Sequence, residues 1–167
     1  MAGEHGGGYL LGMNTFLQRV LSTTDSVLPL IARLTLGIII LPHGLQKLLG
    51  WFGGHGFSAT MGFFTEQMHI PWIFALAAVL TESLGSLALI LGFASRVSAA
   101  LVGVVMAVAA LTVHLSVGFF MNWSGMQKGE GFEFHLLAIG LALVVVVGGG
   151  GRASVDRLLM RKQATVA

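Results

Sequence analysis

Four ionisable side chains lie inside long apolar stretches of this sequence, where a charge is costly. His43, Glu82, His114 and His135 each interrupt such a stretch. A charge at the centre of a bilayer costs at least about 2.5–3.5 kcal/mol, so groups of this kind are paired, hydrated or functional. We take the four as candidate proton-transfer or ligand-binding residues, and whether they are catalytic is left open.

The first apolar stretch carries further polar groups on one helical face. His43, Gln46 and Lys47 follow the spacing i, i+3, i+4, which places them together on a helix. Arg33 projects to the same broad face. A carboxylate such as Glu82 must be neutralised inside a membrane. Arg33 and Lys47 are the available cations, one deeper in the membrane than Glu82 and the other less deep.

Small residues surround the other candidates. Alanine and glycine recur at helical spacing around Glu82, His114 and His135. Small side chains let membrane helices approach closely, so these faces should point into a helix bundle. At 1.5 Å per residue, His43 lies about 10 Å and Glu82 roughly 15 Å from the outer ends of their stretches. We therefore expect the four side chains to converge in a buried pocket in the outer half of one bundle.

Quinone binding is the first chemistry that fits this pocket. Histidine N–H groups and Lys47 would hydrogen-bond the carbonyl oxygens of a quinone, and Glu82 would deliver protons. Aromatic side chains at the mouth would contact its ring. The residues predicted to contact this cofactor are Arg33, His43, Gln46, Lys47, Glu82, His114, Trp123 and His135.

Two other chemistries remain open. The donors His43, Glu82, His114 and His135 would suit Zn, Cu or Fe, because imidazole and carboxylate bind these metals. Metal binding is less favoured, because no two of these donors have the i, i+3 or i+4 spacing of a pair on one helix. Finally, the pocket would hold a lipid or a small apolar ligand without turnover.

The composition predicts a membrane protein. Of 167 residues, 55% are hydrophobic and 10% are charged, whereas soluble domains carry roughly 25% charged residues. The mean hydropathy is +0.87. The net charge of +2 comes without a basic stripe that carries interleaved aromatics, which argues against nucleic-acid binding. The absence of cysteine excludes disulfides, thiolate metal sites and dithiol redox chemistry.

The apolar stretches are long enough to cross a bilayer, which takes about 20 helical residues. The predicted spans are residues 27–49, 71–93, 98–120 and 132–148. Between the first two, apolar residues at helical spacing over 57–69 predict a short interfacial or re-entrant helix. The predicted fold is all-α: an integral membrane four-helix bundle with this additional helix. We divide the chain into a tail (1–26), the membrane domain (27–151) and a basic tail (152–167).

Charged and aromatic residues predict the orientation. Basic residues mark one side of the membrane at Arg19, Arg96, Arg152, Arg157, Arg161 and Lys162. Trp51, Trp72 and Trp123 fall on the other side. By the positive-inside rule, both termini should be cytoplasmic. The Gly-punctuated loop 121–131 should then cover the pocket from the outer side as a lid, with Glu130 and Glu133 simply solvated.

Several motifs resemble the DoxX family over roughly residues 33–156. They are HGLQK at 43–47, GWFGG at 50–54, Glu82 in a span of small residues, GFASR at 92–96, HLSVGFFMNW at 114–123 and GEGFEFH at 129–135. The last motif is the most specific. The resemblance implies a four-helix, multi-pass protein of the bacterial inner membrane.

The resemblance also bears on function. The family takes its name from a subunit of an archaeal thiosulfate:quinone oxidoreductase, and some relatives belong to membrane-associated oxidoreductase assemblies. By analogy, this chain would be a quinone-interacting subunit or accessory of a redox system, with a redox partner subunit. The alternative is a non-enzymatic membrane factor, such as a carrier of small molecules or lipids, or a chaperone for a partner.

Overall fold

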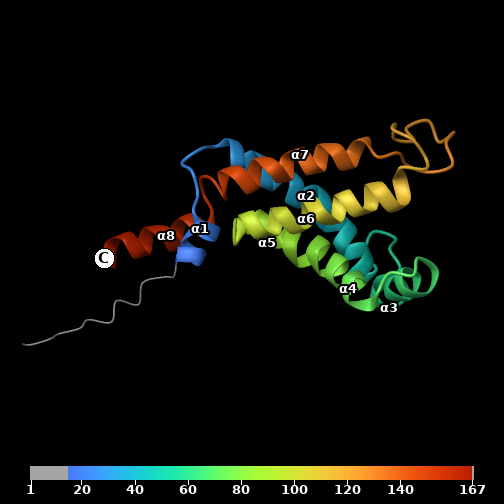
Figure 1. Cartoon of the computed structure of the whole chain (residues 1–167), viewed down its shortest axis with the longest axis horizontal. Coiled ribbons are helices and arrows are strands. Elements are labelled where there is room, and N and C mark those ends of the chain that lie inside the picture. The colour runs from blue at the N-terminus through green and yellow to red at the C-terminus, as the bar shows by residue number, and fades with distance from the viewer. Residues whose placement is uncertain (1–14, 167) are drawn as a thin grey trace, which may run out of the picture.

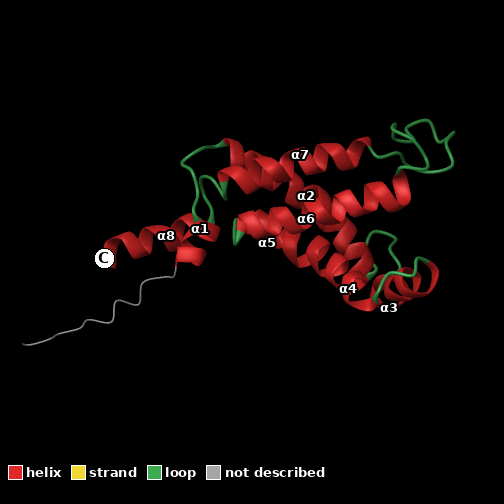
Figure 2. Cartoon of the chain, in the orientation of Figure 1, coloured by secondary structure: helices red, strands yellow, loops and turns green. Residues whose placement is uncertain are grey.

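The computed structural model of the chain describes residues 15–166, with side chains described up to residue 161. Helices joined by loops and turns make up this part of the chain, which contains no strand (Figure 2). The predicted all-α class is confirmed. Residues 1–14 of the predicted N-terminal tail and the side chain of Lys162 lie outside the described residues.

Four apolar helical segments form the bundle (Figure 1). The first is α2 (Leu28–Leu49), and the second runs from Trp72 to Leu91 through α4 (Trp72–Leu80), η2 (Thr81–Gly85) and α5 (Ser86–Leu91). The third comprises α6 (Ser95–Ala109) and η3 (Ala110–His114), and the fourth is α7 (Glu133–Gly148). The first three are long and apolar enough to cross a membrane, and α7 is shorter with 16 residues. The predicted four-helix membrane bundle is confirmed.

The third helical segment begins and ends earlier than the predicted span 98–120. Its start is fixed by Asp156, whose carboxylate accepts hydrogen bonds from the backbone N–H groups of Ala94 and Ser95 at 2.7 and 2.9 Å. A carboxylate in this position satisfies N–H groups that a helix leaves unpaired at its start. At the other end the chain leaves the helix at a turn over residues 115–117.

The short helix predicted between the first two spans is present. It comprises α3 (Gly56–Gly62) and η1 (Phe63–Gln67). The first span ends before it at Gly50, whose φ of 74° is the left-handed conformation that glycine adopts readily at a helix C-terminus. Met61 of α3 then packs against Ala75 and Val79 of α4, which anchors the short helix to the second span.

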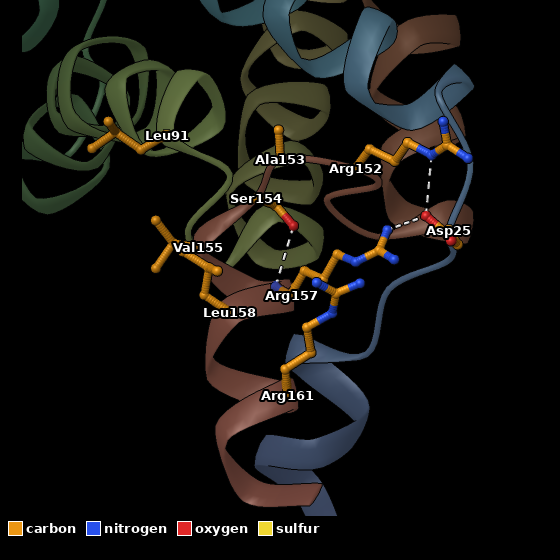
Figure 3. A pocket seen from close by; sticks show the side chains of 9 residues that line it. All are labelled: Asp25, Leu91, Arg152, Ala153, Ser154, Val155, Arg157, Leu158 and Arg161. Carbon is orange, nitrogen blue, oxygen red and sulfur yellow. Dashed lines mark hydrogen bonds and ion pairs between the residues drawn. The ribbon is translucent and has the colours of Figure 1, made fainter. Parts of the chain in front are cut away.

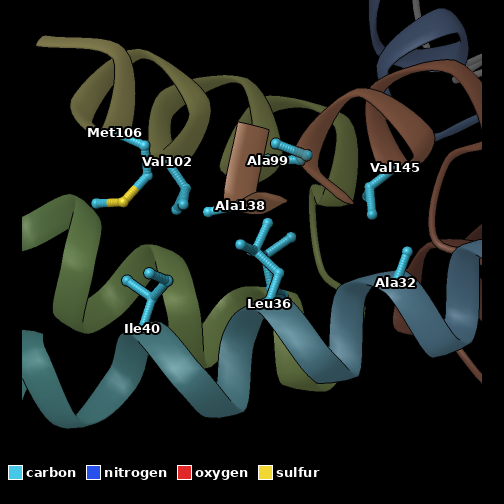
Figure 4. Close-up of a cluster of buried hydrophobic side chains, with 10 residues drawn as sticks. Ala32, Leu36, Ile40, Ala99, Val102, Met106, Ala138 and Val145 are labelled. Carbon is cyan, nitrogen blue, oxygen red and sulfur yellow. The ribbon is translucent and has the colours of Figure 1, made fainter. Parts of the chain in front are cut away.

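The main core lies between α2, α5, α6 and α7 (Figure 4). Its buried members are Ala32, Leu36, Ile40, Leu89, Ala99, Val102, Met106, Ala138, Ala142 and Val145. Large apolar side chains also cover the outside of the bundle, such as Leu111, Leu137 and Val147, each more than 60% exposed. An apolar exterior around a core of this kind is expected when the solvent is lipid.

Glycines bring α2 close to the second span. Gly37 faces the backbone of Ser86, and Gly44 faces the backbone of Glu82 so closely that a Cβ atom would overlap it. Small residues at helix contacts allow this approach in membranes. As a result, the C-terminal half of α2 lies directly against the segment that carries Glu82.

Two candidate residues lie in π-helical turns. Glu82 belongs to η2, and His114 is the last residue of η3. π-helical turns insert an extra residue into a helical turn and are frequent at functional sites. Uniform α-helical spacing, on which the predicted helical faces rest, does not predict these turns.

Both described parts of the predicted tails contain helices. These are α1 (Thr15–Leu21) and α8 (Val155–Val166), which contact each other at one end of the bundle (Figure 1). The same end carries Arg33, buried near the start of α2, and Arg96, which donates to the carbonyl oxygens of Ser22 and Val146.

Candidate functional site

An ion pair joins the C-terminal end of the first span to the middle of the second. The Nζ atom of Lys47 lies 2.5 Å from Oε2 of Glu82, and the two side chains are 26% and 8% exposed. Lys47 stands in the last turn of α2, and Glu82 stands in η2. The close approach at Gly44 makes this contact possible. Lys47 is therefore the cation that neutralises the acid.

Arg33 is not brought to this pair. It lies 14 residues earlier on the same helix, about 21 Å at 1.5 Å per residue. Its buried guanidinium donates to backbone carbonyl oxygens of Leu89, Ile90, Gly150, Arg152 and Ala153. Arg33 thus ties the C-terminal end of the second span to the turn after α7. Sequence spacing placed it on the right face of α2 but at the wrong depth for the cluster.

His114 and His135 lie in direct contact. Their ring centroids are 4.2 Å apart, with the planes tilted by 40°. Nδ1 of His114 lies 2.8 Å from the backbone carbonyl oxygen of Glu130. A carbonyl oxygen can only accept a hydrogen bond, so Nδ1 is the protonated donor. His135 is 6% exposed, and its buried Nδ1 has no hydrogen-bond partner among the described residues. Buried polar atoms without a partner are uncommon and call for an explanation.

His43 links the ion pair to the two histidines. Its ring centroid lies 6.3 Å from that of Phe134, which in turn lies 5.6 Å from that of His135. His43 is within electrostatic range of Lys47 and Glu82 on one side and of His135 on the other. We call the set His43, Lys47, Glu82, His114 and His135 the outer-end cluster, after the side of the membrane on which the sequence predicts it to lie.

The outer-end cluster is not fully enclosed. His43 is exposed on the surface of α2, and the side chain of Lys47 is partly exposed. The same set contains two strongly buried members, Glu82 and His135. The cluster therefore extends from the interior of the bundle to the surface that would face lipid between α2 and α7.

Two further candidates do not join the cluster. The side-chain amide of Gln46 donates to the carbonyl oxygen of Phe52 at 3.1 Å and so holds the turn after α2. Trp123 is 87% exposed in the loop before α7, and its Nε1 lies 3.3 Å from Oε1 of Glu133.

The loop before α7 is ordered by its acidic residues. Glu130 accepts a hydrogen bond from the backbone N–H of Asn122, and Glu133 accepts one from that of Met121. The expectation that both carboxylates are simply solvated is thus wrong. The loop extends beyond the ends of α6 and α7 (Figure 1), and its contact with the cluster is the bond from His114 to the Glu130 carbonyl.

The described residues do not assemble the alternative metal site. Among them, no group of three or more His, Asp or Glu side chains is arranged to hold a metal ion. The Glu82 carboxylate is engaged by Lys47, and Nδ1 of His114 is engaged by a carbonyl oxygen. Two of the four predicted metal donors, Glu82 and His114, are therefore engaged by other partners.

The fold and the cluster define a polytopic helical membrane protein with ionisable side chains between its spans. The sequence profile of the DoxX family matches residues 28–115, more than half of the chain, so the chain belongs to the DoxX family. The chain is also similar to the inner membrane protein YqjF of Escherichia coli K12, with 27% identity over 133 residues, 80% of this chain and 92% of YqjF. No solved structure matches the chain. The chain is thus an integral inner-membrane protein of this family.

Proposed function

We propose that the protein binds the headgroup of a quinone at the outer-end cluster, as a quinone-interacting subunit or accessory of a membrane redox system. The observation that supports this most is the buried, unpartnered Nδ1 of His135, adjacent to the ring of His114. A ligand can form a hydrogen bond with this unpartnered imidazole nitrogen without breaking a hydrogen bond that the protein already makes.

The chemistry of a quinone matches the groups present. Its two carbonyl oxygens accept hydrogen bonds, and neutral imidazoles at His43 and His135 each offer an N–H. Phe134, between them, contributes an aromatic face for the quinone ring. The exposed position of His43 gives a lipid-dissolved carrier a lateral route from the bilayer, so that its tail stays in hydrocarbon.

Reduction of a quinone adds two electrons and two protons to its oxygens. The Lys47–Glu82 pair is the proton-exchanging group of the cluster and lies next to His43. A dithiol in this chain cannot supply the electrons, because it contains no cysteine. The proposal therefore includes a redox partner as the electron donor. It also includes cytoplasmic termini, which place the cluster near the opposite, outer face.

The test is to purify the full chain in mild detergent and quantify co-extracted quinone by mass spectrometry. We expect quinone in near-stoichiometric amount, and at least a tenfold loss in His43→Ala and His135→Ala. His43→Ala guards against misfolding, because this side chain is exposed. The matched control is His55→Ala, which removes an exposed histidine outside the cluster, directly before α3.

Two outcomes would overturn the proposal. Quinone at the same trace level in the wild-type protein and all variants would remove the evidence for a site. Co-extraction of another lipid in place of quinone, lost in the same two variants, would favour the non-enzymatic carrier. Metal analysis of the same samples tests the remaining alternative.

A further inference from the structure

A hollow lies beside α8, at the end of the bundle opposite the outer-end cluster (Figure 3). Its volume is about 680 Å³, and charged and apolar side chains share its lining. Arg152, Arg157 and Arg161 supply three positive charges, against the one negative charge of Asp25. The described lining thus carries a net charge of +2, three positive charges less one negative.

Asp25 shows that the arginines are arranged to hold an anion. Nε of Arg152 lies 3.1 Å from Oδ1 of Asp25, and Nη1 of Arg157 binds the same oxygen atom. Hydrogen bonds from Arg157 and then Arg152 hold the pKa of the Asp25 carboxyl well below its ordinary value. Each guanidinium has five N–H donors, and the bonds to Asp25 use one on each. Guanidinium groups are also the donors with which proteins commonly bind phosphate.

Apart from Ser154, the lining beside these charged groups is apolar and lies at the edge of the membrane-spanning region. Leu91 is the last residue of the second span, and Leu158 on α8 is 64% exposed. In Figure 3 Leu91, Val155 and Leu158 lie on one side of the hollow, and the guanidinium groups lie on the side of Asp25. A phosphate at the arginines would therefore have acyl-chain contacts beside it.

We propose that this hollow binds the phosphate of an anionic phospholipid headgroup, with Arg152 and Arg157 as its ligands and Asp25 as the built-in counterion that it displaces. Free inorganic phosphate shares the same chemistry. The apolar wall at the end of the second span favours the lipid, because inorganic phosphate gains nothing from Leu91 or Leu158. The inference is independent of the outer-end cluster.

The test uses the full chain in nanodiscs and native mass spectrometry to count retained lipids. Nanodiscs of phosphatidylcholine with a minor fraction of phosphatidylglycerol supply both headgroups. We expect selective retention of phosphatidylglycerol, reduced about fivefold in Arg152→Gln and in Arg157→Gln, as one juxtamembrane charge predicts. Arg19→Gln is the matched control, since it removes one exposed charge from α1 without altering the lining.

Asp25→Asn gives the sharpest result. It removes the competing carboxylate but keeps the arginines, so retention of phosphatidylglycerol should rise severalfold, opposite in sign to the arginine variants. If the ion pairs are only structural, retention of phosphatidylglycerol should change in the same direction in all three variants. That result would overturn the proposal. An equal loss of retained phosphatidylglycerol in Arg19→Gln would attribute the retention to the general positive charge of the surface and would overturn the proposed site. Two results together would assign the site to free inorganic phosphate instead of the lipid. Millimolar inorganic phosphate would displace the lipid, and the protein would retain phosphatidylglycerol no better than phosphatidylcholine.

Discussion

Lys47 and Glu82 form an ion pair at the point where Gly44 lets α2 touch the backbone of the second span. The two residues are 35 positions apart in the sequence, and their ion pair fixes the C-terminal end of α2 against η2. Ion pairs of this kind set the register of helices, and their removal exposes the remaining partner to an environment that solvates it poorly.

Removing one partner of this pair should be costly. We expect Glu82→Gln to lower the free energy of unfolding by about 3–5 kcal/mol, because Lys47 is left charged and poorly solvated. The double variant Lys47→Met with Glu82→Gln should recover most of this loss. Denaturant unfolding in detergent micelles measures both values. Additive losses in the double variant would show that the two side chains do not interact.

The glycine at position 44 should not tolerate a methyl group. A Cβ atom there would overlap the carbonyl group of Glu82, so Gly44→Ala should cost about 1–3 kcal/mol as the helices separate. Gly140→Ala on α7 is the matched control, because nothing lies near its Cβ position. That control should be neutral or stabilise by about 0.5–1 kcal/mol through helix propensity. Thermal unfolding measures the stability of both variants. Equal stability of Gly44→Ala and Gly140→Ala would contradict the close contact between α2 and the backbone of Glu82.

Arg33 should prove structural. Arg33→Met removes the guanidinium donor from five carbonyl oxygens, of which that of Leu89 keeps a hydrogen bond from the Gly92 N–H. The variant should destabilise the protein by at least about 3 kcal/mol. Hydrogen exchange should rise in residues 150–153. Arg33→Lys should not rescue this, because an ammonium cannot reproduce the planar fork of donors. Loss of quinone from a stable, fully folded Arg33→Met would instead place Arg33 in the ligand site.

The loop before α7 should depend on Glu133. Glu133→Gln weakens the bonds to the Met121 backbone and to the Trp123 indole, each worth roughly 1–2 kcal/mol. The fluorescence anisotropy of a variant that keeps only Trp123 should fall as the loop loosens. Glu66→Gln, at an exposed position on η1, is the control and should leave the anisotropy unchanged. An unchanged anisotropy in Glu133→Gln would show that its carboxylate does not order the loop.

The sequence analysis found the spans because hydrophobic length is a direct signal of a membrane helix. The short helix after the first span was also predicted, as was the position of His43 near Glu82 and near His135. The helices α1 and α8 were missed, because α1 has only seven residues and α8 is polar, so neither has the hydropathy of a span. The predicted cytoplasmic position of both termini stays a prediction.

The errors at the site have a common physical cause. Side-chain spacing places residues on a helical face, but it does not show which backbone groups of other segments lie within hydrogen-bond distance of them. The five carbonyl acceptors of Arg33 and the backbone N–H groups bound by Glu130 and Glu133 were therefore invisible. The π-helical turns at Glu82 and His114 shift the register by one residue, which uniform spacing cannot anticipate.

Photolabelling with an azidoquinone tests the quinone site most directly. The probe is applied to the full chain in nanodiscs, and the labelled peptide is identified by mass spectrometry. The account predicts label on α2 near His43 or on α7 near Phe134 and His135, suppressed by excess native quinone and absent in His135→Ala. Label spread along the lipid-facing helices, insensitive to native quinone and to that substitution, would contradict it.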